Sequence, residues 1–303
     1  MLNNIKDLEI GKTQEIQLLI KNAEQAKTRT GEMYQKLVVR DANEHEIVMF
    51  NFKEQITGNF PIVIKATVDT SEYKESACTK LLSFQLDSQS KPEEFLPKAQ
   101  VDSKKLLNEL AKYQKSIRLG LRKIVASILN ENRKTFVYYP FSKTGIFSRT
   151  SGILEATWRL TMLAEQTAVT TGLDRDLMIA GAMLYYIGKT QTIDNSYNYT
   201  EDDVLMGAGL TAALTVQMKV KEILSGDDEE AKAAIDIKDV KLLTHILSSR
   251  FKGIPSATPE ACALRYLDAL VTETEAIKNI QKENEPGTVV SDRNIYGNRV
   301  YCY

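Results

Sequence analysis

Histidine and cysteine are scarce in this chain of 303 residues, which contains two histidines and three cysteines. A reaction or metal centre that needs several imidazoles is excluded, because only His45 and His245 are available. The cysteines at positions 78, 262 and 302 form no CxxC pair, so neither a zinc ribbon nor a disulfide framework is indicated. Reduced thiols are typical of the cytoplasm, and we expect a cytoplasmic protein.

Long apolar runs and an excess of one charge are also missing. The N-terminus lacks the basic-then-apolar pattern of a signal peptide, and no run of about 20 apolar residues occurs, so no membrane association is expected. The formal net charge is −1, so any nucleic-acid site must be a local basic patch. With 43% hydrophobic and 26% charged residues, the composition is that of a globular protein, and the length favours two domains.

The first 86 residues contain short segments in which hydrophobic residues alternate with polar ones, the pattern of half-buried β-strands. Turn signals that contain glycine, asparagine or aspartate separate several of them. The segments comprise residues 15–20, 33–39, 47–52, 61–69 and 81–86. Five short strands at this spacing predict a small barrel or sandwich.

The character of the sequence changes after a polar, proline-containing segment at residues 87–101, which is typical of a linker. From residue 102 the hydrophobic residues follow a helical period. Asp102 and Ser103 are candidate caps of one long helix that reaches Ile128, and further helices are expected at residues 151–171, 174–187, 201–224, 239–251 and 259–280. We therefore predict domains at 1–86 and 102–282, and a polar tail at 283–303.

Several helical segments resemble those of the YhaM-type 3′-5′ exoribonucleases, which join an N-terminal OB-fold to an HD phosphohydrolase domain. Residues 152–157 (Gly-Ile-Leu-Glu-Ala-Thr) are similar to that family's Gly-Leu-x-x-His-Thr helix. Residues 180–189 are similar to its Gly-x-Met-Leu-His-Asp-Leu-x-Lys helix, and residues 267–269 to its late aspartate motif. The resemblance implies an α+β multidomain protein, with a five-stranded OB-like β-barrel followed by an all-α HD-like domain, and it suggests a homo-oligomer.

The departures from the family pattern fall on its metal-binding positions. The resemblance places there Ala156, Tyr185, Tyr186, Ala208, Arg250, Phe251 and Asp268. HD enzymes hold divalent metal through imidazoles and carboxylates, and Asp268 alone keeps a family ligand. We therefore expect no metal, no cofactor and no catalytic residue, and a chain that is not an enzyme.

Each of these positions also has a second interpretation. Tyr185 and Tyr186 could line a new binding pocket, although filling of the space vacated by the metal is favoured. Asp268 could bind a lone cation, although pairing with a base such as Arg250 is favoured. An active nuclease could instead have rebuilt its ligands around Asp268, for instance with Asp194, Asp202 or Asp203. A third alternative is a protein-interaction subunit that imitates the exonuclease.

Nucleic-acid binding is expected in the OB-like half, because OB folds bind single strands through aromatic side chains and a basic groove. Phe50 and Phe52 share one face of their strand and are interpreted as barrel core, whereas Tyr34 and Lys36 share a face that points to solvent. The residues predicted to contact single-stranded RNA or DNA are Lys27, Arg29, Tyr34, Lys36, Tyr73, Arg118, Arg122 and Lys143. For Arg118 and Arg122, a solvated helix face is an equally good interpretation.

Overall fold

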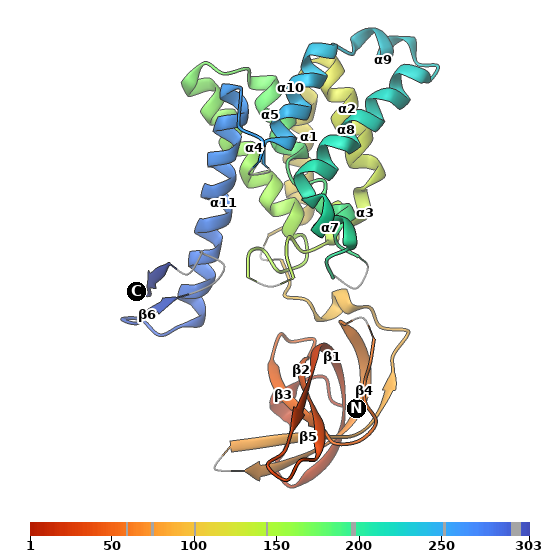
Figure 1. Cartoon of the computed structure of the whole chain (residues 1–303), viewed down its shortest axis with the longest axis vertical. Helices are drawn as coiled ribbons and strands as arrows, with labels where there is room; N and C mark the ends of the chain where they lie inside the picture. Colours follow the sequence, from red (N-terminus) through yellow and green to blue (C-terminus); the bar gives the residue numbers. More distant parts are fainter. Residues whose placement is uncertain are drawn as a thin grey trace. The chain divides into compact units, whose positions relative to one another are not determined.

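The computed structural model describes residues 1–58, 60–73, 76–99, 101–143, 145–194, 198–250, 253–291 and 298–303. Residues Met1–Pro97 form one compact unit, and Lys98–Asp194 with Tyr199–Tyr303 form a second (Figure 1). The first unit is a closed barrel and the second is built of helices, so the predicted fold class is confirmed. None of the helices in the described part of the chain is both long and apolar enough to cross a membrane.

Five strands close the barrel in the order β1-β2-β3-β5-β4. They are β1 (Lys12–Lys27), β2 (Met33–Arg40), β3 (Glu46–Asn51), β4 (Ile62–Tyr73) and β5 (Ser76–Leu86). The β3–β5 pair is parallel and the other neighbouring pairs are antiparallel. Because side chains alternate along a strand, Leu37, Met49 and Ile64 fill the interior while their neighbours in sequence face outward.

Strand β1 is longer than the predicted segment of residues 15–20. Its first half pairs with β4 and its second half pairs with β2, with a register shift between Ile20 and Asn22. The second half is polar and mostly exposed, so it lacks the alternation that marked the other strands. Because this long, bent strand pairs with a different neighbour in each half, it closes the barrel. Its second half lies alongside β2.

A buried carboxylate fixes the N-terminal segment to the β2–β3 turn. The Asp41 side chain is fully buried; its Oδ2 accepts a hydrogen bond from the Ile5 N–H at 2.6 Å, and its Oδ1 accepts from the Asn43 and His45 N–H groups. His45 Nδ1 lies 3.1 Å from Oδ2. Burial alone would raise the pKa of Asp41, but the hydrogen bonds from Ile5, His45 and Asn43 outweigh it and lower the pKa below its ordinary 3.8.

Asp41→Asn is expected to destabilise the barrel by about 2 kcal/mol at neutral pH, because a charged acceptor of several N–H groups is lost. A carboxyl whose pKa is lowered by folding stabilises the protein above its unfolded pKa, and this contribution disappears as the pH falls through the folded value. Denaturant unfolding from neutral to acid pH should therefore show the two proteins converging in acid. Asp7→Asn, at an exposed aspartate of the same segment, is the control. A constant difference at all pH values would contradict this role.

The segment predicted as a linker packs on the barrel over its first part. Residues Pro92–Phe95 form a 3-10 helix, and Phe95 is buried against Leu19 and Val63. Asp87 donates its N–H to the Val63 carbonyl, and its carboxylate accepts a hydrogen bond from Gln17.

The second unit surrounds one buried helix. The longer helices are α1 (Ser103–Ser116), α2 (Leu119–Glu131), α4 (Gly152–Thr171), α5 (Arg175–Leu184), α8 (Gly207–Ser225), α10 (Ile237–Ser248) and α11 (Pro259–Glu283), and the shorter ones are α3 (Arg133–Tyr138), α6 (Lys189–Thr192), α7 (Glu201–Leu205) and α9 (Glu229–Ala234). Every residue of α5 from Leu177 to its end is buried, and the helix packs against α4, α10, α2, α11 and α1. The end of α5 therefore lies inside the unit.

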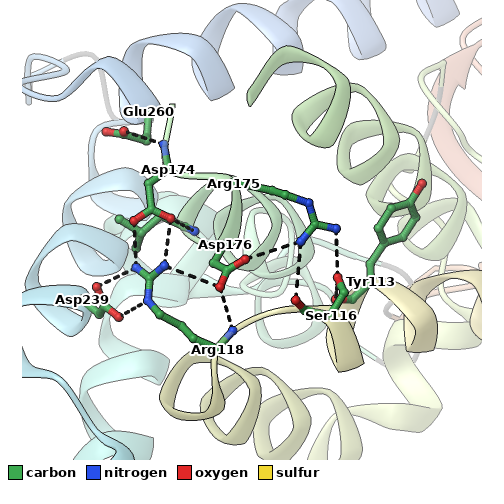
Figure 2. A network of polar contacts seen from close by, with 9 residues as sticks. Tyr113, Ser116, Arg118, Asp174, Arg175, Asp176, Asp239 and Glu260 are labelled. Atoms are coloured by element: carbon green, nitrogen blue, oxygen red, sulfur yellow. Dashed lines mark hydrogen bonds and ion pairs between the residues drawn. The ribbon is translucent and has the colours of Figure 1, made fainter. Parts of the chain in front are cut away.

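The prediction of one long helix from residue 103 to Ile128 is wrong, because the chain turns at Ile117–Arg118 and separates α1 from α2. Figure 2 shows the cause: the Arg118 guanidinium lies between the carboxylates of Asp174 and Asp239. Its backbone N–H donates to Asp176 at 2.8 Å. Carboxylates that are distant in sequence thus stabilise Arg118 in an extended backbone conformation. The helical period of the sequence did not indicate this break between two helices.

The described part of the tail forms a hairpin on α11. Strands β6 (Val289–Ser291) and β7 (Arg299–Tyr301) pair antiparallel. Val300 and Cys302 are buried against Ala276 and Ile280 of α11, so this polar-looking tail has an apolar inner face.

Candidate functional site

The helical unit holds two adjacent tyrosines at the end of α5, where the family pattern has a metal-binding pair. Tyr185 and Tyr186 are 1% and 0% exposed. Their rings meet edge to face at 5.5 Å between centroids, and Phe141 meets Tyr186 at 4.8 Å. The Tyr186 hydroxyl donates to Asp268 Oδ1 at 2.6 Å. The aromatic rings therefore fill this space, and one hydroxyl binds the retained carboxylate.

Arg250 brings a cation to the same cluster. Its Cζ lies 4.3 Å from the Tyr185 ring centroid and 5.1 Å from that of Tyr186, within the range of cation–π contacts. Its Nη1 donates to the Tyr185 carbonyl, and its Nη2 is 3.9 Å from Asp268 Oδ2. A guanidinium thus places a positive charge next to Asp268 in this structure.

The remaining family metal positions offer no ligand atom in their side chains. Ala156 is fully buried in α4, and Ala208 lies in the first turn of α8. The Ala208 carbonyl packs so closely on Gly188 that a Cβ added there would lie 2.0 Å from the oxygen. Phe251 lies outside the described residues.

Burial controls the protonation of the groups around this cluster. It raises the pKa of Tyr185 and of Tyr186 well above 10, and the neighbouring Asp268 carboxylate raises both further. Burial also lowers the pKa of Lys189 to about 8, assisted by the charge of Arg250. Lys189 Nζ lies 4.2 Å from the Phe141 ring centroid. Both tyrosines are therefore neutral phenols at physiological pH.

These side chains do not fit the divalent-metal site that an HD domain implies. Such a site needs several imidazole or carboxylate ligands, whereas Asp268 is engaged by Tyr186 and Arg250, and neutral phenols are poor ligands. The alternative with ligands rebuilt around Asp268 would need further carboxylates beside it, for which Asp194, Asp202 and Asp203 were the candidates. Across the described ranges, no three His, Cys, Asp or Glu side chains come together in a possible metal-binding group.

A closed group of ion pairs lies between the loop before α4, α4 itself and α11. Arg149 donates to Glu155 at 3.0 Å and to Glu275 at 2.6 Å. Arg159 donates to the same two carboxylates at 2.6 and 3.1 Å. Both guanidinium groups lie 5.0 Å from the ring centroid of the buried Phe147. The two arginines are therefore balanced by two glutamates.

The predicted phosphate contacts of the helical unit have different surroundings. The Arg118 guanidinium is held by Asp174 and Asp239, which favours a structural role. Arg122 is half-buried and donates to the Lys115 carbonyl at 3.5 Å, and Lys143 is exposed in the loop before α4. Arg118 and Arg122 lie one turn apart at the start of α2, whereas Lys143 lies in the loop before α4.

The barrel carries an aromatic cluster on its outer face. Tyr34 of β2 stacks on Phe52 with ring centroids 5.0 Å apart and an interplanar angle of 17°, and its ring lies 6.0 Å from that of Phe50. Phe52 is 39% exposed, and Tyr34 and Phe50 are half-buried. The interpretation of Phe50 and Phe52 as barrel core is wrong, because Met49 and Asn51 occupy the inward positions of β3.

Lysines flank this aromatic cluster on both sides. The strand register places Lys36 of β2 opposite Phe50 of β3, and Phe50 opposite Lys80 of β5. Both lysines are exposed, and the strand register places Glu24 of β1 opposite Lys36 and Asp69 of β4 opposite Lys80. Lys80 was not among the residues predicted to contact nucleic acid, because its position beside Phe50 depends on the parallel pairing of β3 with β5. We call Tyr34, Lys36, Phe50, Phe52 and Lys80 the barrel face.

The other predicted barrel residues lie at the two ends of this face. Lys27 and Arg29 are exposed at the β1–β2 turn, next to the Tyr34 end. Tyr73 is 63% exposed at the β4–β5 turn, near the start of β5 and therefore near the start of the parallel strand β3. The structure thus groups Lys27, Arg29, Tyr34 and Lys36, and places Tyr73 at the opposite end.

Comparison with known proteins finds relatives along almost the whole chain, although no established family profile matches it. The 3′-5′ exoribonuclease YhaM of Listeria monocytogenes is 24% identical over an alignment that covers 95% of this chain and 94% of the relative. The protein of the same name from Bacillus licheniformis is 23% identical, over 92% of this chain and 91% of the relative. Another from Listeria welshimeri is 24% identical over 95% of this chain.

These names correct one expectation and confirm another. The expectation that the chain is not an enzyme is contradicted, because the relatives are named for an enzymatic activity. That expectation relied on ligand types alone, whereas the sequence match to named exoribonucleases covers more than 90% of the chain. Over most of its length the chain is thus similar to proteins named 3′-5′ exoribonuclease YhaM, as its motifs predicted.

Proposed function

We propose that this chain binds single-stranded RNA on the barrel face. The observation that carries the proposal is the stacked pair of Tyr34 and Phe52 on the outside of a closed barrel, next to Phe50 and its exposed register neighbours Lys36 and Lys80. Unstacked bases pack on aromatic rings of this kind, and each such contact contributes about 1–3 kcal/mol. The names of the relatives favour RNA as the nucleic acid.

The lysines supply the second half of such a site. A single strand whose base stacks on Phe50 would have its backbone within reach of Lys36 or Lys80, since these residues are register neighbours of Phe50 on either side. The chain as a whole has a net charge of −1, so attraction to phosphate depends on local lysines. Contacts of this type make affinity fall as salt rises, because bound counterions are released.

Lys36→Ala combined with Lys80→Ala is expected to weaken binding of an oligouridylate and to flatten its salt dependence. Removing two phosphate contacts to a single strand should reduce the slope of log K against log salt by about 1.4. Fluorescence anisotropy over a salt series measures both effects. Lys12→Ala, at an exposed lysine near the start of β1, is the control. A slope identical to that of the unmodified protein would place the phosphate contacts elsewhere.

A second candidate function is 3′-5′ shortening of the bound RNA, and the names of the relatives favour it. The side chain on which to test it is Asp268, the retained family carboxylate. End-labelled RNA incubated with Mg²⁺ or Mn²⁺ reports shortening directly. Shortening that Asp268→Ala abolishes would establish the activity in this chain, whereas intact RNA under all conditions would leave binding as the function.

Three further expectations stay predictions: the homo-oligomer, the cytoplasmic location and a protein partner. Binding of single-stranded DNA is a fourth, and the barrel face offers the same ring stacking to DNA bases. Competition of labelled RNA by unlabelled DNA measures the preference between the two.

A further inference from the structure

The C-terminal hairpin displays a second pair of stacked tyrosines. Residues alternate along β7, so Arg299 and Tyr301 point outward while Val300 is buried. Tyr301 is 59% exposed and Tyr303 is 88% exposed. Their rings lie 6.4 Å apart between centroids at an interplanar angle of 27°. Two large rings are thus stacked on each other in solvent, beside an exposed arginine.

The hairpin is anchored, so these rings are presented from a supported backbone. Val300 and Cys302 are 5% and 1% exposed and pack on α11. Gln281 of α11 donates its side-chain N–H to the Tyr301 carbonyl at 3.0 Å. Cys302 exchanges backbone hydrogen bonds with Gly287 and Thr288. Ordering of the strand therefore does not have to accompany binding, which lowers the entropy cost of using it as a platform.

We infer that the outer face of this hairpin, Arg299 with Tyr301 and Tyr303, is a second base-stacking site for single-stranded RNA. A base that stacks on the tyrosine pair would bury apolar ring surface that is now exposed. Arg299 shares the outer face with Tyr301 and can reach the neighbouring phosphate. The inference rests on the proposed RNA binding and adds a second contact to it.

The surroundings of the tyrosine pair favour a nucleic acid over a protein surface. On the outer face of the hairpin, Tyr301 pairs with the exposed Val289 and Arg299 pairs with Ser291, so the rings adjoin one small apolar side chain and a cation. Lys278 and Lys282 are exposed on α11 within one turn of Gln281, the residue that contacts the hairpin. Stable protein interfaces are wider and apolar at their centre, whereas single-strand sites combine separate rings with basic groups.

The test compares full-length variants in binding an oligouridylate of about 20 nucleotides, longer than the roughly 4–16 that one OB fold covers. Tyr301→Ala with Tyr303→Ala should weaken the affinity by about fivefold or more, and Tyr301→Phe with Tyr303→Phe should restore it, because phenylalanine keeps the ring. Tyr138→Ala is the matched control, since Tyr138 of α3 is 58% exposed. All variants should unfold at the same temperature as the unmodified protein.

Two results would overturn the inference while leaving RNA binding intact. The first is a Tyr301→Ala, Tyr303→Ala variant that binds the oligouridylate as tightly as the unmodified protein and the Tyr138→Ala variant do. This result would count whether or not the substitutions change the oligomeric state. The second is a phenylalanine variant that binds as weakly as the alanine variant, which would assign the effect to the hydroxyls. Failure of the unmodified protein to bind RNA would instead refute the proposed function.

Discussion

Replacement of Glu275 by alanine is expected to lower the free energy of unfolding of the helical unit by about 3–5 kcal/mol. Glu275 is 4% exposed and accepts hydrogen bonds from both Arg149 and Arg159. Without it, two guanidinium groups pressed against Phe147 would share the single carboxylate of Glu155. A positive charge without a partner would then remain in a poorly solvated environment. Removing one partner of a buried ion pair in this way lowers the free energy of unfolding strongly.

The single tryptophan provides the readout for this experiment. Trp158 lies in α4 and donates its indole N–H to Glu109 at 2.6 Å, so its fluorescence reports on the helical unit. Glu229→Ala is the control, because Glu229 pairs with Lys232 on the surface and its side chain is 82% exposed. Such exposed pairs contribute about 0–1 kcal/mol. If Glu275→Ala costs no more than Glu229→Ala, the buried ion-pair group does not support the unit.

Tyr34→Ala combined with Phe52→Ala is expected to weaken RNA binding by about 2 kcal/mol or more, which is roughly 30-fold in Kd. The two rings stack on each other at 5.0 Å, so their removal eliminates a continuous surface for bases. Either single substitution should cost less, because one ring stays in place. Anisotropy at low salt measures the difference where phosphate contacts keep residual binding detectable.

The controls for this experiment separate stacking from folding. Tyr34→Phe with Phe52→Tyr keeps both rings and should preserve affinity. Leu86→Ala removes an exposed apolar side chain of β5, 66% exposed, and should have no effect on RNA. Circular dichroism shows whether the barrel is intact in each variant. If the double alanine variant binds RNA as tightly as the Leu86→Ala variant, the stacked pair is not part of the RNA site.

The barrel could be predicted from the sequence because its hydrophobic residues alternate on strands with one buried face. The same rule failed where a strand has no buried face, as in the second half of β1. It also failed to orient β3, because phenylalanines were assigned inward on hydrophobicity, whereas the inward positions hold Met49 and Asn51. The inward Asn51 is stabilised by hydrogen bonds to Gln35 and the Glu54 carbonyl, which no local pattern shows.

Long-range polar contacts explain the remaining differences. The turn between α1 and α2 depends on carboxylates of Asp174 and Asp239, which are 56 and 121 residues away from Arg118. The motif positions of Tyr186 and Asp268 could be placed by resemblance, but their hydrogen bond and the contact of Arg250 with both tyrosines required the tertiary structure. The helical period of a sequence predicts which face of a helix is buried. It does not predict which charged side chains contact one another.

Photocrosslinking of the full chain to a 4-thiouridine oligonucleotide, followed by identification of the linked peptides, shows which surface of the protein contacts RNA. We expect links to the peptides that carry Tyr34 and Phe50–Phe52, and loss of these links when Tyr34 and Phe52 are both alanine. Links confined to peptides of the helical unit, with none between Lys27 and Lys53, would contradict the proposal that the barrel face binds RNA.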